Sequence, residues 1–235
     1  MLKAIVIISF MLIYTLECFS QKEGYIALST GPGMPVGEFA GQDYNNEKAG
    51  LAKLGAFFDL SYAAKLGKNF GFSVLLRGQS NAIDSKRIEA ELLRLNPGFN
   101  FLVKSKNWGA SNLMIGGYGS FPLNTENHSS FETRALIGII SATSPEIRIN
   151  ATYGNSSQNY INRSITATSY SLLVGAGFKF NLNSKICLIT NLDILASEPK
   201  FNYKVITYST VPGESFEFRQ QMTTINLGVG VGFRL

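Results

Sequence analysis

The last stretch of the chain, 222-MTTINLGVGVGFRL-235, decides the fold because its side chains alternate from Ile225 to the end. Counting in steps of two places Ile225, Leu227, Val229, Val231, Phe233 and Leu235 on one face. The other face holds Asn226, three glycines and Arg234. A strand has a period of two residues, so one face is apolar and the other is small or polar. An apolar outside and a crowded polar inside are typical of a membrane β-barrel, and the stretch predicts its closing strand.

The N-terminal residues 1–20 have the pattern of a cleaved export signal. Lys3 supplies a positive charge, residues 4–16 form an apolar run, and small residues precede Gln21. A retained membrane helix needs ~20 apolar residues, and this run is too short. We therefore expect two parts, a signal peptide over 1–20 and one outer-membrane barrel domain over 21–235.

The composition fits an exported bacterial envelope protein. Charged residues make up 16% of the chain, against a usual ~25%, and there are 23 Gly, 17 Phe and 10 Tyr. Of the two cysteines only Cys187 remains after cleavage, so no intramolecular disulfide is expected. The net charge is +5 with Lys and Arg scattered, which gives no support to a nucleic-acid partner. Outer-membrane lipid and lipopolysaccharide, whose phosphates suit basic rims, are the expected surroundings.

The same alternation recurs along the chain, and the connections between the alternating stretches differ in length. Short turns are expected near 66–69, 104–107, 142–146 and 181–184, and longer polar connections near 34–49, 80–89, 122–130, 155–164 and 198–221. Outer-membrane barrels alternate short periplasmic turns with long external loops and have an even number of strands. The sequence therefore predicts an all-β, up-and-down antiparallel transmembrane β-barrel.

The stretch from Asn124 to Arg163 decides the strand count. As one long outer loop it would leave eight strands. Residues 131–139 and 147–153 both alternate, however, with Ser144-Pro145 between them as a turn. We favour ten strands, with eight as the alternative.

Charged residues that fall on the inward phase are the candidate functional residues. They are Lys53, Asp59, Arg77, Arg94, Glu132, Arg134, Arg148, Asp193 and Arg234. Charge is costly against lipid, so these side chains should pair with one another or with water inside the barrel. A salt-bridged plug and a narrow ion-selective path both remain open, because side chains largely fill a lumen of eight to ten strands.

The exported start, the segment 31-GPGMPVG-37 and the glycine-rich closing strand resemble the outer-membrane β-barrel (porin-family) proteins of Bacteroidota. The resemblance covers essentially the whole mature chain. It implies a small barrel similar to the OmpA and OmpX types, which usually have eight strands, and it brings no shared catalytic residues. Location in the bacterial outer membrane is implied as well.

Little in the sequence points to catalysis. The single histidine, His128, is expected in an external loop, and Cys187 falls on the inward phase as a small filler. No metal, cofactor or catalytic residue is predicted. We expect a non-enzymatic protein with a structural or surface-interaction role through its external loops and a surface or periplasmic protein as partner. The alternatives are a narrow porin-like channel and a rim enzyme on envelope lipid that depends on His128.

Overall fold

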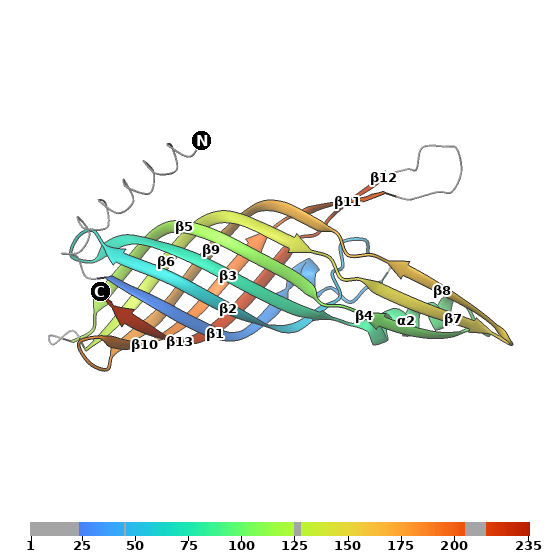
Figure 1. The fold of residues 1–235 in the computed structure, drawn as a ribbon, viewed down its shortest axis with the longest axis horizontal. Coiled ribbons are helices and arrows are strands. Elements are labelled where there is room, and N and C mark those ends of the chain that lie inside the picture. Colours follow the sequence, from blue (N-terminus) through green and yellow to red (C-terminus); the bar gives the residue numbers. More distant parts are fainter. Residues whose placement is uncertain (1–23, 45, 125–127, 205–214) are drawn as a thin grey trace, which may run out of the picture.

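The computed structural model describes residues 24–44, 46–124, 128–204 and 215–235 and contains a closed antiparallel barrel of eight strands. The barrel strands are β1 (Gly24–Val36), β2 (Ala52–Lys65), β3 (Phe70–Ile83), β5 (Trp108–Pro122), β6 (Ser129–Thr143), β9 (Thr166–Asn181), β10 (Ile186–Ser197) and β13 (Met222–Arg234). They follow the order β1-β13-β10-β9-β6-β5-β3-β2 around the barrel (Figure 1). The expected signal peptide, residues 1–20, lies outside the described residues.

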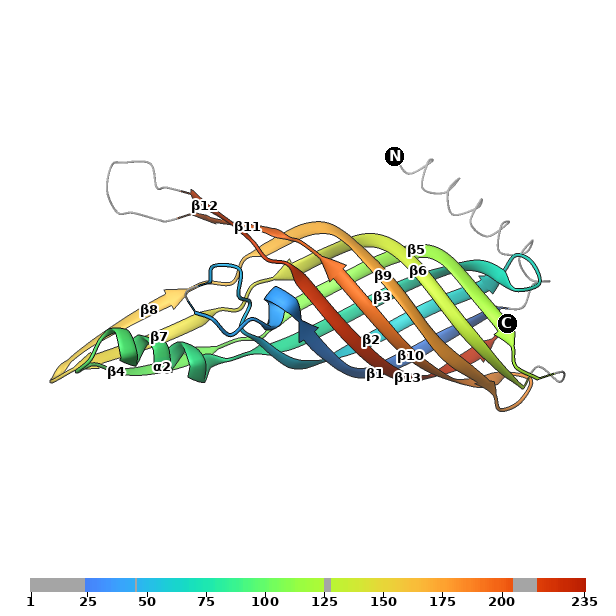
Figure 2. The ribbon, with the colours of Figure 1, turned by 180° about the vertical axis from the view of Figure 1, so that it is seen from behind.

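The remaining elements lie at one end of the barrel. They are the 3-10 helix η1 (Gly37–Ala40), the helix α2 (Ser85–Leu95) and the strands β4 (Asn100–Ser105), β7 (Ile147–Tyr153), β8 (Ser156–Asn162), β11 (Lys200–Lys204) and β12 (Ser215–Arg219). We call this end the loop end. The opposite end holds the short connections and the C-terminus, and we call it the turn end (Figures 1 and 2). Among the described residues, no helix is long and apolar enough to cross a membrane.

The preference for ten strands was wrong, and the alternative of eight is confirmed. Residues 147–153 do form a strand, but β7 pairs with β4 and β8 in a separate three-stranded sheet rather than in the barrel. The sheet projects beyond the loop end (Figure 2). Alternation marks any half-exposed strand, so it could not separate a strand in the membrane from one that extends beyond it.

Several expected connections change place as a result. The short turns predicted at 104–107 and 142–146 lie at the loop end, beside the joins between the barrel and the projecting sheet, and the described residues of the connection 122–130 lie at the turn end. The segment between the expected connections at 80–89 and 104–107, including Leu93 and Leu95, was interpreted as a strand, but it begins as helix α2. Its N-cap is Asp84, which accepts a hydrogen bond of 3.1 Å from the Arg87 amide. Ile88 and Leu92, four residues apart, pack toward Val103 of β4, and this helical spacing was the missed signal.

The alternation itself is confirmed in the closing strand. In β13 the side chains of Leu227, Val229, Val231 and Phe233 are exposed, whereas Asn226 and the glycines between them are buried. Outward-facing Leu60, Leu76, Ile137 and Leu192 of other strands are also large and exposed. An apolar surface of this extent is not tolerated in water, and it suits the hydrocarbon of a bilayer. The chain is a transmembrane β-barrel.

Two neighbouring glycines of β5 provide a test of the inward crowding. A Cβ atom added at Gly116 would stand 2.1 Å from the Ala135 carbonyl oxygen, whereas one added at Gly117 would meet nothing within 4 Å. We expect Gly116→Ala to lower the free energy of unfolding by about 1–3 kcal/mol, the usual cost of overpacking. Gly117→Ala should change it by less than about 0.5 kcal/mol. Urea titration in detergent, read by heat-modifiable gel migration, measures both; equal losses would contradict the inward placement.

Candidate functional site: the filled lumen

Four charged side chains meet across the middle of the barrel. Arg77 of β3 donates from Nε to Asp59 Oδ1 at 2.7 Å and from Nη2 to Asp59 Oδ2 at 2.7 Å. The same Nη2 donates to Asp193 Oδ2 at 2.6 Å. Arg134 of β6 completes the group through Nε to Asp193 Oδ1 at 3.0 Å and Nη2 to Asp193 Oδ2 at 2.6 Å. Two arginines and two aspartates thus alternate, and we call them the central ion cluster.

Burial makes this cluster costly to disturb. The side chains of Asp59, Arg77 and Asp193 are 0% exposed and that of Arg134 is 11% exposed. The Arg77 guanidinium also lies over the Phe57 ring, with Cζ 4.4 Å from its centroid. Each charge has a partner of opposite sign and a charge-assisted hydrogen bond, which offsets its desolvation.

The strand register explains how the four residues reach one another. Asp59 and Arg77 are direct cross-strand partners on β2 and β3. Asp193 and Arg134, however, are separated by β9, where Gly175 pairs with both. A Cβ at Gly175 would stand 2.0 Å from Asp193 Oδ1, so the glycine gives the carboxylate room to pass over β9. A small residue between two charged strands is therefore part of the cluster's construction.

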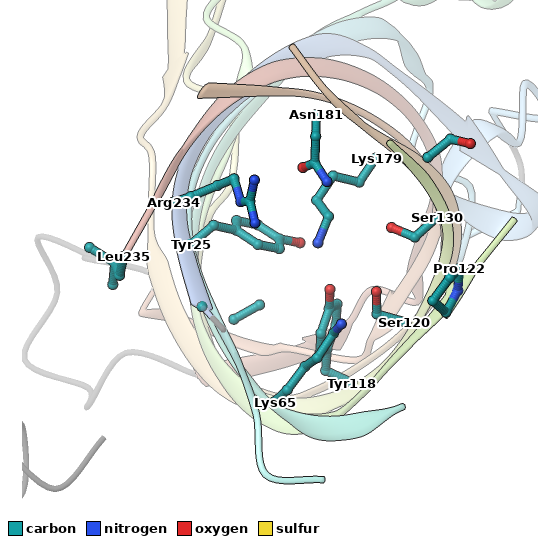
Figure 3. Close-up of a pocket in the computed structure, with 13 residues that line it drawn as sticks. Tyr25, Lys65, Tyr118, Ser120, Pro122, Ser130, Lys179, Asn181, Arg234 and Leu235 are labelled. Atoms are coloured by element: carbon teal, nitrogen blue, oxygen red, sulfur yellow. The ribbon is translucent and has the colours of Figure 1, made fainter. Parts of the chain in front are cut away.

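A second polar group occupies the lumen at the turn end (Figure 3). Glu132 of β6 accepts a hydrogen bond from Tyr25 Oη at 2.7 Å and another from the Tyr118 hydroxyl. Lys179 Nζ lies 3.1 Å from Glu132 Oε1 and 5.1 Å from the Tyr25 ring centroid. A single carboxylate thus joins β1, β5, β6 and β9. Beside it a cavity of about 50 Å³ is lined by Ser130, Arg234 and other polar residues.

Amides and aromatic rings fill the lumen toward the loop end. Gln79 Nε2 donates to Asn81 Oδ1 at 2.9 Å, and Asn81 Nδ2 donates to the Gly33 carbonyl at 2.9 Å. Beyond them Phe39 of η1 and Trp108 of β5 pack edge to face with centroids 5.6 Å apart. Their buried cluster also contains Ile140, Phe201 and Met222. We call this buried apolar cluster, with Phe39 and Trp108 at its centre, the loop-end cap.

Four of the nine predicted lumen residues, Asp59, Arg77, Arg134 and Asp193, form the central ion cluster. Glu132 also lies inside the barrel, in the polar group nearer to the turn end. Arg234 lies at the turn-end mouth, where Nη1 is 3.5 Å from the Asn183 carbonyl oxygen. The inward assignments of Lys53, Arg94 and Arg148 were wrong.

Each of the three errors has a local cause. The ladder between β2 and β3 shifts register between Ala52 and Gly55, which turns Lys53 outward to an ion pair of 2.9 Å with Asp84. Burial raises the pKa of the Asp84 carboxyl, but hydrogen bonds from Lys53 and the Arg87 amide hold that pKa below its ordinary value. Arg94 belongs to helix α2 and pairs with Glu91.

Arg148 lies on β7 and pairs with Glu146, both outside the barrel. Its hydrogen bond and that of Lys106 lower the pKa of the Glu146 carboxyl. Sequence reasoning also missed Tyr25, Tyr118 and Lys179 as lumen residues. The alternation of apolar residues places Lys179 and Tyr25 on the inward face of their strands, so both could have been predicted. Around Tyr118 the glycines interrupt the alternation, so the sequence does not show which way that side chain faces.

The two residues weighed for catalysis lie apart. Cys187 is fully buried, and its Sγ is 3.5 Å from the Gly232 carbonyl oxygen. His128 is at the turn end, not in a loop-end connection as expected, and its carbonyl accepts a hydrogen bond of 2.8 Å from the Asn181 amide. The described residues contain no group of three or more His, Cys, Asp or Glu side chains that could hold a metal.

Known structures share this architecture. OprG from Pseudomonas aeruginosa superposes with a TM-score of 0.50 at 7% identity, over 91% of this chain and 96% of OprG. The fold is that of small outer-membrane β-barrels. A major outer membrane protein from Thermus thermophilus gives 0.46 at 10% identity, over 90% of this chain and 99% of that one.

Ail, the attachment invasion locus protein of Yersinia pestis, gives a TM-score of 0.44 at 12% identity, over 91% of this chain and 99% of Ail. At such identities the likeness shows the fold alone. No protein-family model and no curated protein matches the sequence. The resemblance to the Bacteroidota family stays a prediction.

The central ion cluster should dominate the response of stability to charge removal. Asp193→Asn takes away the carboxylate that both arginines share and leaves a buried positive charge underpaired. We expect a loss of about 3–5 kcal/mol in the free energy of unfolding, measured by urea titration in detergent. Glu217→Gln is the matched control, because its ion pairs with Lys200 and Arg219 are half exposed and contribute at most about 1 kcal/mol. A loss no larger than the control's would show that the cluster does not hold the barrel together.

Proposed function

We propose that the protein is exported with removal of residues 1–20, spans the bacterial outer membrane and has a structural or surface-interaction role without catalysis. Outer-membrane barrels place short turns in the periplasm and long loops outside, so the turn end is periplasmic and the loop end faces the exterior. The filled lumen supports a structural barrel. The projecting loop-end sheet supports an interaction at the surface.

The free edge of β8 is the observation that carries the proposal. All seven residues of β8 are exposed, and in the described part of the chain the strand pairs with β7 alone. An unpaired edge offers backbone donors and acceptors to an added strand. The partner class is therefore a protein with an extended segment at the cell surface.

The turn of the hairpin indicates which groups face outward. Tyr153 and Ser156 pair across the two-residue turn at Gly154, which has a φ of +56°. Such flanking residues exchange hydrogen bonds with each other, and the pattern alternates along the strands. Ser157, Asn159 and Ile161 thus direct their backbone N–H and C=O groups away from β7. A proline at one of them removes an outward donor and keeps the β7 ladder.

The edge can be tested with a synthetic peptide of the β7 sequence IRINATY, residues 147–153, labelled for fluorescence anisotropy. The purified protein in detergent should bind it saturably, and Asn159→Pro should weaken binding roughly tenfold, because the donor for strand addition is gone. Asn159→Ala keeps the donor and is the matched control. Equal affinity for the two variants, or no binding to the wild type, would remove the β8 edge from the proposal.

Lipopolysaccharide is the second proposed contact at the loop end. Arg163 and Arg219 are exposed there, and they stand beyond the apolar outer surface of the barrel. Their chemistry suits lipid phosphates. This contact would anchor the barrel in the outer leaflet without changing the protein partner proposed for β8.

The channel alternative makes a distinct prediction. Because side chains from opposite strands meet at the central ion cluster, we expect the purified protein to give no steady conductance in planar bilayers. Stable single-channel currents would instead favour the narrow pore. Arg94→Ala and Arg148→Ala are unsuitable probes of a pore, since both residues lie in the loop-end extension. Substitution of Arg134 would report on it.

The rim-enzyme alternative rests on His128 at the turn end. We expect His128→Ala to leave the envelope lipid composition unchanged, as measured by mass spectrometry of extracted lipid. A change would revive that alternative.

A further inference from the structure

The turn-end cavity is lined by cationic and hydroxyl groups. Lys65, Lys179 and Arg234 line the cavity of about 50 Å³ together with the hydroxyl groups of Ser120 and Ser130. Figure 3 shows these side chains coming from different strands and pointing into the lumen. Convergent donors of positive charge are the usual construction of an anion site.

The carboxylate of Glu132 does not neutralise the Arg234 guanidinium, whose positive charge is therefore available to a ligand. Glu132 is the carboxylate buried nearest to the cavity, and it already accepts from Tyr25, Tyr118 and Lys179. The Arg234 guanidinium forms no ion pair with any described residue, and its one hydrogen bond among them is a weak contact of 3.5 Å with the Asn183 carbonyl oxygen. The guanidinium can therefore turn its other donors to a ligand in the cavity.

Two buried hydroxyl groups beside the cavity are available to an occupant. Ser120 is 0% exposed and Ser130 is 6% exposed, and Oγ of each lacks a hydrogen-bond partner among the described residues. Ser130 points into the cavity, as Figure 3 shows. A buried polar atom without a partner is costly, and a ligand or water with a free acceptor would satisfy it.

The size of the cavity limits the ligand. A cavity needs at least roughly 10–15 Å³ of such volume to hold one water, so about 50 Å³ has room for a few waters or one small anion and no larger ligand. We propose that the turn end binds a small oxyanion, a phosphate or a carboxylate group, between the Arg234 guanidinium and the Ser130 hydroxyl. The site lies at the end of the barrel opposite β8, so it goes beyond the proposed surface role and can fail independently of it.

Calorimetric titration of the full mature chain in an uncharged detergent tests this site. Sodium phosphate and sodium acetate are titrated separately at constant ionic strength. Arg234→Gln should weaken binding roughly tenfold, as expected for the loss of one charge-assisted hydrogen bond. Ser130→Ala removes a hydroxyl that has no described partner, so folding should persist while affinity falls roughly threefold. Arg94→Gln makes the same charge change on helix α2, outside the barrel, and it should bind as the wild type does.

The anion that binds more tightly assigns the ligand class, phosphate or carboxylate, provided that both turn-end variants weaken it and the control does not. Heat-modifiable migration on a gel first establishes that each variant is folded. The absence of saturable binding by either anion would overturn the proposal. An equal loss in Arg94→Gln would do the same, because it would reduce the effect to the net charge of the protein.

Discussion

Closure of the sheet is the constraint from which the rest of the structure follows. In hydrocarbon no water can satisfy backbone N–H and C=O groups, so a strand edge inside the bilayer is untenable and every strand must pair on both sides. The ladder from β1 through β13 and back to β2 does this with eight strands. Eight strands enclose a lumen only wide enough for side chains. The contents of that lumen are therefore set by the closure itself.

A lumen this narrow requires large and small residues to be matched between strands. Gly175 lies between Arg134 and Asp193, and Gly177 lies between Glu132 and Asn191. A Cβ at Gly177 would stand 1.8 Å from the Thr190 carbonyl oxygen. Gly175 thus gives room to the charged Asp193 side chain, Gly177 lets the backbones of β9 and β10 approach, and Gly228 and Gly232 of β13 give room to Phe57 and Cys187. Large charged side chains fit inside the barrel because glycines on the neighbouring strands leave space for them.

The sequence allowed the barrel and the inward phase of most strands to be predicted, because a period of two is a property of each strand alone. Asp59, Arg77, Arg134 and Asp193 could be assigned to the interior in this way, but not to one another, since their pairing depends on which strands adjoin after closure. Lys53 was misplaced because a register shift at Gly55 changes the phase locally. Arg148 was misplaced because β7 alternates just as a membrane strand does. Helix α2 was missed because Leu93 and Leu95 also fit a period of two.

Along the barrel axis, a packed middle lies between two ends that differ in chemistry. In the central ion cluster the four charges pair with one another, although Arg77 Nη1 has no hydrogen-bond partner among the described residues, and the loop-end cap consists mainly of apolar side chains packed together. At the loop end the unsatisfied groups are backbone donors and acceptors on the edge of β8. At the turn end they are Ser120, Ser130 and the guanidinium of Arg234. Backbone edges select extended protein segments, whereas converging cations and hydroxyls select small anions. The packed lumen lies between the β8 edge and the turn-end cavity. A ligand bound at one of these sites therefore makes no direct contact with the other site.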